Sequence, residues 1–263
     1  MPRLKFTKMV GSGNDFILIA GKPSGNLSRL AKLLCDRKFG IGADGLLLLD
    51  KCKNADLSMR IFNADGSEAQ MCGNGARCVA FFSGKAKSRI RTSAGMINTQ
   101  VYGAQVKIQI TDPKDIKLDL PIVISKRTLR VNFINTGVPH AVIFVEGLDK
   151  IDVKSLGCQI RYHKKFSPAG TNVNFVEMVN KNSIKVRTYE RGVEDETLAC
   201  GTGSVAASLI SSFMLQAPGT KMLNVHTRGN ETLKVYFKES KDRFADVWLE
   251  GKAKIVYKGE YYV

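Results

Sequence analysis

An internal repeat built around two cysteines constrains this chain more than any other feature of its sequence. The segment Glu68-Ala-Gln-Met-Cys72-Gly-Asn-Gly75 recurs as Glu196-Thr-Leu-Ala-Cys200-Gly-Thr-Gly203, with the glutamate, the cysteine and both glycines at a constant offset of 128 residues. Upstream, Arg60-Ile-Phe62-Asn63 corresponds to Arg187-Thr-Tyr189-Glu190, with one additional residue in the second copy. A solenoid needs three or more repeats, so two copies separated by about half of the chain predict two similar domains.

Each copy has the same local pattern. A strand-like stretch (Leu57–Asn63; Ile184–Glu190) leads through a polar loop to Cys-Gly-x-Gly, and a nearly all-apolar helical segment follows (Ala76–Phe82; Val205–Leu215). A helix that is apolar on all sides belongs in a core. We therefore expect each domain to wrap a sheet around one buried helix.

The rest of the chain is predicted to be mostly strands. The predicted fold class is α/β of the α+β type: two pseudo-symmetric domains, each with a mixed or antiparallel sheet around a central buried helix. The best candidate linker is Asp112-Pro113-Lys-Asp115, which gives an amino-terminal domain over residues 1–112 with Cys72 and a second domain over 113–252 with Cys200. Further strands are expected at 5–10, 16–20, 101–111, 128–135, 141–145, 173–179, 233–238, 245–250 and 253–257, and further helices near 27–39 and 153–164.

Composition indicates a soluble protein. Of the 263 residues, 44% are apolar and 24% charged, which is typical of a globular chain long enough for a large core. Apolar runs such as Leu46–Leu49 are far too short to span a membrane. The first residues enter a strand pattern without a signal-peptide core, so we expect a cytoplasmic protein with no membrane partner.

The net charge of +16 raises the question of nucleic-acid binding. Lysine and arginine are spread along the chain in twos and threes, and the densest cluster, Lys85–Arg91, has no flanking aromatic stacking platform for bases. A basic soluble surface is therefore favoured over a nucleic-acid groove. Such a surface would also attract a small carboxylate substrate.

The cysteines are predicted to be free thiols. They lie at positions 35, 52, 72, 78, 158 and 200, and no Cys-x-x-Cys pair accompanies the three histidines, so we expect no metal site. Without a secretory signal, disulfides are not expected either. Cys35 and Cys78 fall on apolar helical segments and are expected in the core. Cys72 and Cys200, matched with their glycines, are the candidates for reactive thiols.

A cysteine at the start of a helix is suited to proton transfer. The thiolate is the reactive form, and the unpaired N–H groups of a helix amino terminus favour it. The same N–H groups can hold a carboxylate, and the adjacent glycines let a substrate approach the backbone. Two such cysteines, on equivalent domains that face a shared cleft, would place one base on each side of one carbon. That arrangement predicts stereochemical inversion, with no cofactor required.

At this point the sequence resembles the diaminopimelate epimerase family along nearly its whole length. The two cysteine motifs and five flanking motifs occur in the order typical of that family. They are Gly11-Ser-Gly-Asn14-Asp15-Phe16, Phe62-Asn63-Ala-Asp65-Gly66-Ser67-Glu68 before Met71–Gly75, Pro139-His140, Asn172-Val-Asn174-Phe175, and Tyr189-Glu190-Arg191-Gly192 before Ala199–Gly203.

The resemblance implies that the chain interconverts LL- and meso-diaminopimelate, a small-molecule substrate of lysine and peptidoglycan precursor synthesis, without metal or cofactor. It also implies that residues 253–263 return to the first domain and that a homodimer is possible. Cys72 and Cys200 would be the acid and base, and His140 would lie near a thiol. Gly73, Asn74, Gly201 and Thr202 would receive the carboxylate at the reacting end, while Asn14, Asn63, Asn172, Glu190 and Arg191 would hold the amino groups and the distal end.

Two departures from the family pattern affect recognition of the distal end. Val138 stands where some members have asparagine, and Gly45 where some have glutamine. From the residues alone, Asn14 and Asn63 could also be turn residues, and Glu190-Arg191 could be a surface ion pair.

Three other classes of function stay open at the level of sequence, the first being another isomerase of the same fold. A proline racemase of the same fold would use opposed cysteines without a distal clamp, whereas a phenazine-pathway isomerase should lack the cysteine pair. A thiol redox protein would use Cys72 and Cys200 as a disulfide switch. A nucleic-acid-binding protein is the third alternative.

Overall fold

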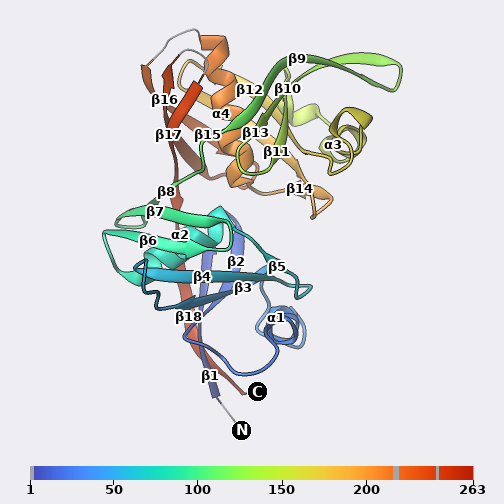
Figure 1. Ribbon diagram of the computed structural model, residues 1–263. Coiled ribbons are helices and arrows are strands. Elements are labelled where there is room, and N and C mark those ends of the chain that lie inside the picture. Colours follow the sequence, from blue (N-terminus) through green and yellow to red (C-terminus); the bar gives the residue numbers. More distant parts are fainter. Residues whose placement is uncertain (1–2, 216–218, 241–242, 263) are drawn as a thin grey trace. The chain divides into compact units, whose positions relative to one another are not determined.

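The computed structural model describes residues 3–215, 219–240 and 243–262. It divides into two compact units (Figure 1). Unit 1 comprises residues 1–109 and 250–263, and unit 2 comprises residues 110–249. Most of the described residues lie in strands, with four α-helices among them. The predicted α+β fold class is confirmed.

Unit 1 builds a mixed sheet on two helices. Strand β1 pairs antiparallel with β2 and β18, β2 runs parallel to β3, β3 is antiparallel to β4, and β4 runs parallel to β6. The elements are β1 (Arg3–Gly11), β2 (Asn14–Ala20), α1 (Leu27–Cys35), β3 (Gly45–Asp50), β4 (Leu57–Asn63), β5 (Glu68–Ala69), α2 (Gly73–Ser83), β6 (Lys87–Thr92), β7 (Gly95–Tyr102), β8 (Gln105–Gln109) and β18 (Lys254–Tyr262).

The helices of unit 1 have different environments. In α1, one face packs on the sheet through Ala31, Leu34 and Cys35, and the side chain of Asn26 accepts a hydrogen bond from the Arg29 N–H to cap the helix start. Helix α2 is almost wholly buried and packs against β1, β7 and β8. It ends at Gly84, whose positive φ of 68° suits glycine in the left-handed region.

Unit 2 has the same plan. Antiparallel pairs join β9 to β10, β10 to β11, β12 to β13, β13 to β14 and β15 to β16, and parallel pairs join β11 to β12 and β13 to β15. The elements are β9 (Lys114–Ile124), β10 (Arg127–Asn135), β11 (Pro139–Phe144), α3 (Val153–Arg161), β12 (Asn172–Asn180), β13 (Ser183–Glu190), β14 (Asp195–Thr197), α4 (Gly201–Leu215), β15 (Gly219–Thr227), β16 (Thr232–Ser240), β17 (Arg243–Lys252) and two short 3₁₀ turns, Leu148–Lys150 and Lys164–Phe166.

The repeat seen in the sequence extends to the order and direction of the strands. In unit 1, the parallel pair β2–β3 is connected across α1 and the parallel pair β4–β6 across α2. In unit 2, β11–β12 is connected across α3 and β13–β15 across α4. Helices α2 and α4, which follow the two cysteines, are therefore equivalent elements. Helix α4 packs against β10, β11, β12, β13 and β16, and most of its residues are buried.

Two expectations about strands differ from the structure. The strand predicted over Val101–Thr111 is two strands, because Gly103 adopts a positive φ of 59° and turns the chain between β7 and β8. The predicted linker Asp112–Asp115 runs into β9, whose pairing with β10 is irregular and whose Asp115 and Asp119 have positive φ. This irregularity hides the two-residue alternation on which strand prediction depends.

Candidate active site

Cys72 lies at the amino-terminal cap of α2. Its backbone is extended, with φ −140° and ψ 121°, and its Sγ accepts a hydrogen bond from the Gly75 N–H at 3.5 Å. The first N–H groups of an α-helix have no partner within the helix. They point toward the Cys72 sulfur, where they can stabilise a thiolate or a bound anion. Cys72 is partly exposed, whereas the helix behind it is buried.

Cys200 has the equivalent place in unit 2, directly before α4. It is 7% exposed, and its Sγ lies 3.6 Å from the Thr202 hydroxyl oxygen. The Ser204 N–H donates to the Cys200 carbonyl at 2.9 Å, which begins the helical ladder. Both predicted cysteines are thus thiols at the start of the two equivalent buried helices.

An arginine–glutamate pair braces the loop before each cysteine. In unit 1, Arg60 on β4 makes two 2.7 Å hydrogen bonds to the Glu68 carboxylate on β5. In unit 2, Arg187 on β13 makes two 2.7 Å bonds to Glu196 on β14. Bidentate pairs of this kind fix geometry as well as adding energy. The repeated Arg and Glu positions in the sequence therefore hold the chain that leads into each thiol.

Asn14 and Asn74 meet near the start of α2. Asn74 Nδ2 donates to Asn14 Oδ1 at 2.5 Å, and Asn14 Nδ2 donates to Asp44 Oδ2 at 3.0 Å. Asn74 is buried, whereas Asn14 is partly exposed at the beginning of β2. The structure thus brings two of the predicted substrate contacts together with the helix that Cys72 caps.

Asn63 is exposed at the end of β4 and belongs to a tight turn. Its Nδ2 donates to the Ser67 hydroxyl at 2.9 Å, and its N–H donates to the Ser67 carbonyl at 2.8 Å. Asn63 on β4 pairs with Gly45 on β3, and Gly45 in turn pairs with Phe16 on β2. Asn63 therefore lies at the same end of the sheet as Asn14, and no hydrogen bond among the described residues joins the two.

In unit 2, Glu190 and Arg191 follow one another at the end of β13. The Glu190 carboxylate accepts a 3.0 Å hydrogen bond from Thr197, and the Cys200 side chain also lies within hydrogen-bonding reach of it. Burial raises the pKa of Glu190, and these two hydrogen bonds oppose that shift. The adjacent charges are therefore not a surface ion pair, because the carboxylate turns toward the thiol.

Asn172 supports the turn that carries Arg191. Its Oδ1 accepts from the Arg191 N–H at 2.8 Å, and its Nδ2 donates to the Pro139 carbonyl at 3.0 Å. Arg191 is partly exposed, and its guanidinium reaches the Ala169 carbonyl at 3.4 Å. Asn172 thus links β11, β12 and the end of β13 at the edge where Glu190 lies.

His140 is fully buried on β11 and is held by Asn174. Asn174 Nδ2 donates to the Ala141 carbonyl at 3.1 Å and lies 3.0 Å from His140 Nδ1. A carbonyl can only accept, so the amide orientation is fixed, Nδ1 accepts, and the neutral ring carries its proton on Nε2. Burial, with a smaller contribution from the charge of Arg191, lowers the pKa of His140 to about 3.

We expect His140 to stay neutral well below the pH at which free histidine titrates. Its folded pKa is lower than the unfolded value of about 6.5, so its stabilising contribution is complete above that pH and is lost as the pH falls from there toward 3. The loss is about 1.4 kcal/mol per pH unit in that window. Imidazole NMR signals recorded between pH 8 and 4 should show no titration of His140. A His140→Gln variant should lose less unfolding free energy between pH 7 and 5 than the wild type. A His140 transition near pH 6.5 would contradict this expectation.

Three residues that contribute to these networks had no role in the sequence-based prediction. Asn174 is fully buried and also accepts a 3.0 Å hydrogen bond from Thr188. The two-residue spacing of Asn172 and Asn174 in an otherwise apolar strand was a signal, because both side chains then share one face. Arg77 and Asp44, described below, carried no such signal.

Among residues 3–215, 219–240 and 243–262, no cluster of three or more His, Cys, Asp or Glu side chains has the geometry to hold a metal ion. No helix in the described part of the chain is long and apolar enough to cross a membrane.

Comparison with known proteins identifies relatives over nearly the full length. A family model for diaminopimelate epimerase matches residues 6–116 and 132–256. A diaminopimelate epimerase from Aquifex aeolicus is 42% identical, covering 97% of this chain and 97% of the relative. One from Chlorobaculum tepidum is 40% identical, covering 95% of this chain and 98% of the relative.

Solved structures share the fold at low sequence identity. A phenazine biosynthesis protein of the PhzF family from Bacillus anthracis has a TM-score of 0.78 and 17% identity, covering 100% of both chains. A hydroxyproline epimerase from Agrobacterium vitis, solved with bound trans-4-hydroxy-L-proline, has a TM-score of 0.71 and 15% identity, covering 98% of this chain and 92% of that one. These structures share two pseudo-symmetric domains with this chain.

Proposed function

The chain belongs to the diaminopimelate epimerase family, and we propose that it is an isomerase that interconverts LL- and meso-2,6-diaminopimelate through Cys72 and Cys200. The observation that carries the mechanism is the equivalent position of these two thiols, each at the start of a buried helix in its own unit. Inversion at a carbon needs a base on one face and an acid on the other. Two matched thiols supply that pair without an electron-sink cofactor.

In the proposed reaction, one thiolate removes the α-hydrogen as a proton. The C–H bond breaks, an S–H bond forms, and the electron pair moves into the carboxylate to give an enediolate. The opposite thiol then donates its proton to the other face of the carbon and becomes a thiolate. The reverse isomer is processed by the same steps in the opposite direction, and exchange with solvent restores either state.

The helix starts would stabilise the developing charge. We propose that the backbone N–H groups of Gly73 and Asn74, and of Gly201 and Thr202, hold the carboxylate of the reacting carbon. N–H groups fixed by folding need no reorganisation as negative charge builds up, so they favour the enediolate over the ground state. This proposal uses the backbone of Asn74, because its side chain is engaged with Asn14.

Glu190 is suited to serve Cys200. Its carboxylate is within hydrogen-bonding reach of the thiol, and burial raises its pKa. We propose that Glu190 orients the Cys200 S–H and that Arg191 binds the distal carboxylate, as a guanidinium can do with two parallel hydrogen bonds. The neutral His140 ring, fixed by Asn174, would support the same region.

The remaining parts of the proposal follow from the reaction. Diaminopimelate is a precursor of lysine and peptidoglycan, and we propose that the protein acts in the cytoplasm. The substrate contacts assigned to Asn14, Asn63 and Asn172, and a homodimer, stay predictions.

The proposed substrate can be tested with a small panel. Reduced, metal-free protein would be incubated with LL-diaminopimelate, meso-diaminopimelate, L-proline and trans-4-hydroxy-L-proline, and the stereoisomers would be separated by chiral chromatography. We expect the two diaminopimelate isomers to interconvert and both proline substrates to remain unchanged. Epimerisation of proline or hydroxyproline with diaminopimelate untouched would instead assign the proline racemase reaction to the same thiols.

A further inference from the structure

A continuous chain of hydrogen bonds connects the interior of α2 to an ion cluster on unit 1. Arg77 on α2 is fully buried and donates to Asn74 Oδ1 at 2.5 Å and to the Ser12 hydroxyl at 2.6 Å. Asn74 donates to Asn14, and Asn14 donates to Asp44. We call Arg77, Asn74, Asn14 and Asp44 the amide relay.

The two ends of the amide relay fix its direction. A guanidinium can only donate hydrogen bonds, so the atom of Asn74 that faces Arg77 must be its oxygen. An ionised carboxylate can only accept, so the atom of Asn14 that faces Asp44 must be its nitrogen. Asparagine amides are otherwise free to flip by half a turn. Here both orientations are determined by charged residues, Arg77 and Asp44, which the sequence did not single out.

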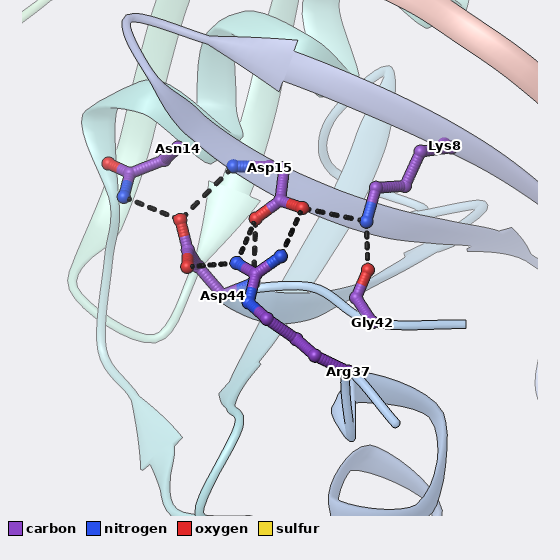
Figure 2. Close-up of polar contacts among 6 residues, drawn as sticks. All are labelled: Lys8, Asn14, Asp15, Arg37, Gly42 and Asp44. Carbon is purple, nitrogen blue, oxygen red and sulfur yellow. Dashed lines mark hydrogen bonds and ion pairs between the residues drawn. The ribbon is translucent and has the colours of Figure 1, made fainter. Parts of the chain in front are cut away.

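The ion cluster holds the accepting end in place (Figure 2). Arg37 donates to Asp15 at 2.8 and 3.1 Å and to Asp44 at 2.8 Å, and the N–H of Asp15 donates to Asp44 Oδ2 at 3.2 Å. Lys8 forms a 2.8 Å ion pair with Asp15 and also donates to the Gly42 carbonyl. Burial would raise the pKa of Asp15, but hydrogen bonds and charge from Arg37 and Lys8 outweigh it and lower the pKa. The Asp15 carboxylate thus stays ionised at neutral pH.

Unit 2 fixes the start of its helix differently. Thr202 takes the place of Asn74 in the repeat, and its carbonyl accepts a 3.2 Å hydrogen bond from the Thr136 hydroxyl. No asparagine pair links this helix to a charged cluster among the described residues of unit 2. The amide relay is therefore a property of the Cys72 side.

We propose that Arg77 and Asp44 are positioning residues that set the amide orientation of Asn14 for the substrate. This inference rests on the proposed function, in which Asn14 contacts diaminopimelate. Each amide oxygen accepts two hydrogen bonds and each amide nitrogen donates two, so Asn14 keeps one donor and one acceptor beyond the relay. With the orientation fixed, the donor and the acceptor are offered to the substrate at defined places. If the Asn14 amide were flipped, its N–H would face a hydrogen-bond donor of the substrate, and that hydrogen bond would be lost.

The decisive variant is Asp44→Asn, which nearly keeps the shape of the side chain but supplies a group that can donate. Asn14 then loses its obligatory acceptor, and only the hydrogen bond from Asn74 Nδ2 still favours its orientation, so the flipped orientation is less strongly opposed. We expect KM for LL-diaminopimelate to rise about tenfold with kcat within threefold, because an interaction present in both ground and transition states is weakened. Arg37→Gln is the matched control: it removes the Arg37–Asp44 ion pair but keeps the Asp44 carboxylate that accepts from Asn14, and KM should change less than threefold.

Arg77 provides the second comparison. Arg77→Lys keeps an obligatory donor and should stay near wild type in KM, whereas Arg77→Gln, which can also accept, should resemble Asp44→Asn. Side-chain amide NMR signals of Asn14 and Asn74, recorded without substrate, should be single in the wild type and doubled or broadened in Asp44→Asn. These signals report on the relay even if the protein fails to use diaminopimelate. An unchanged KM in Asp44→Asn, or unchanged amide signals, would overturn the proposal. Because Asp44 is exposed at the surface, this variant tests the proposal even if the Arg77 variants do not fold.

Discussion

Replacing either Cys72 or Cys200 with alanine is expected to lower the rate of epimerisation by about 10³-fold or more. General acid–base groups contribute about 10²–10⁴-fold each, and here the acid and the base act on the same carbon. Because each variant lacks one of the two groups needed for inversion, the losses should be similar, and the double variant should be little worse than either single one. Initial rates in both directions, measured by chiral chromatography, would test this expectation.

Cys52→Ala is the matched control for the cysteine variants. Cys52 is partly exposed, and hydrogen bonds from the Asn54 N–H and, to a lesser extent, from Arg91 lower the pKa of its thiol. It is therefore an ionisable thiol without a partner in the repeat, and its loss should leave the rate within twofold. If Cys72→Ala retained more than a tenth of the wild-type rate, a thiol at this position would not be an essential base.

Gly203→Ala is expected to be the most damaging substitution outside the thiols. A Cβ at this position would lie 2.3 Å from Asn174 Oδ1, 3.2 Å from Cys200 Sγ and 3.2 Å from Cys200 Cβ. The Asn174 side chain is held in place by hydrogen bonds with Ala141, His140 and Thr188, so it cannot move aside for the added methyl group. The start of α4 would have to move instead. A displacement of about 1 Å at a reacting group costs on the order of 10²-fold in rate, and we expect at least that loss, together with a lower melting temperature.

Gly75→Ala is the equivalent substitution in unit 1 and should be mild. The added Cβ would meet Leu47 Cδ2 at 2.9 Å, the far end of a flexible side chain, and Cys72 Cβ only at 3.7 Å. Alanine also favours a helix over glycine by up to about 1 kcal/mol, which offsets part of the repacking. We expect activity within about fivefold of wild type. Equal damage from the two substitutions, measured by kcat and by thermal unfolding, would contradict the assigned contacts around Gly203.

The sequence predicted the parts of this protein that depend on local pattern. The equal spacing of Glu, Cys and Gly in the two copies identified both thiols and the helices behind them, because a cap and a helix are determined by neighbouring residues. The Arg60 and Arg187 matches were visible in the same way, and the structure explains them as braces to Glu68 and Glu196.

The parts that sequence alone missed depend on contacts between distant segments. Arg77 was passed over in the sequence as one residue of a nearly all-apolar segment, and only the fold brings it to Ser12 and to the Asn74–Asn14 pair. Asp44 lies 30 residues from Asn14 and becomes its acceptor because β2 and β3 run parallel and adjacent. Strand β9 was missed for a different reason, since its bulged pairing with β10 breaks the alternation.

The measurement that tests the two-thiol mechanism most directly is α-hydrogen exchange in heavy water, followed by NMR for the wild type and both cysteine variants. We expect early meso product to carry one deuterium, at the inverted carbon, while unreacted LL substrate keeps its hydrogen. Each alanine variant should exchange the α-hydrogen of only one isomer, the one whose hydrogen faces the remaining thiol, and should not invert it. Product that retains the original hydrogen, or inversion by either variant at a rate near that of the wild type, would show that a single base serves both faces and would contradict the mechanism.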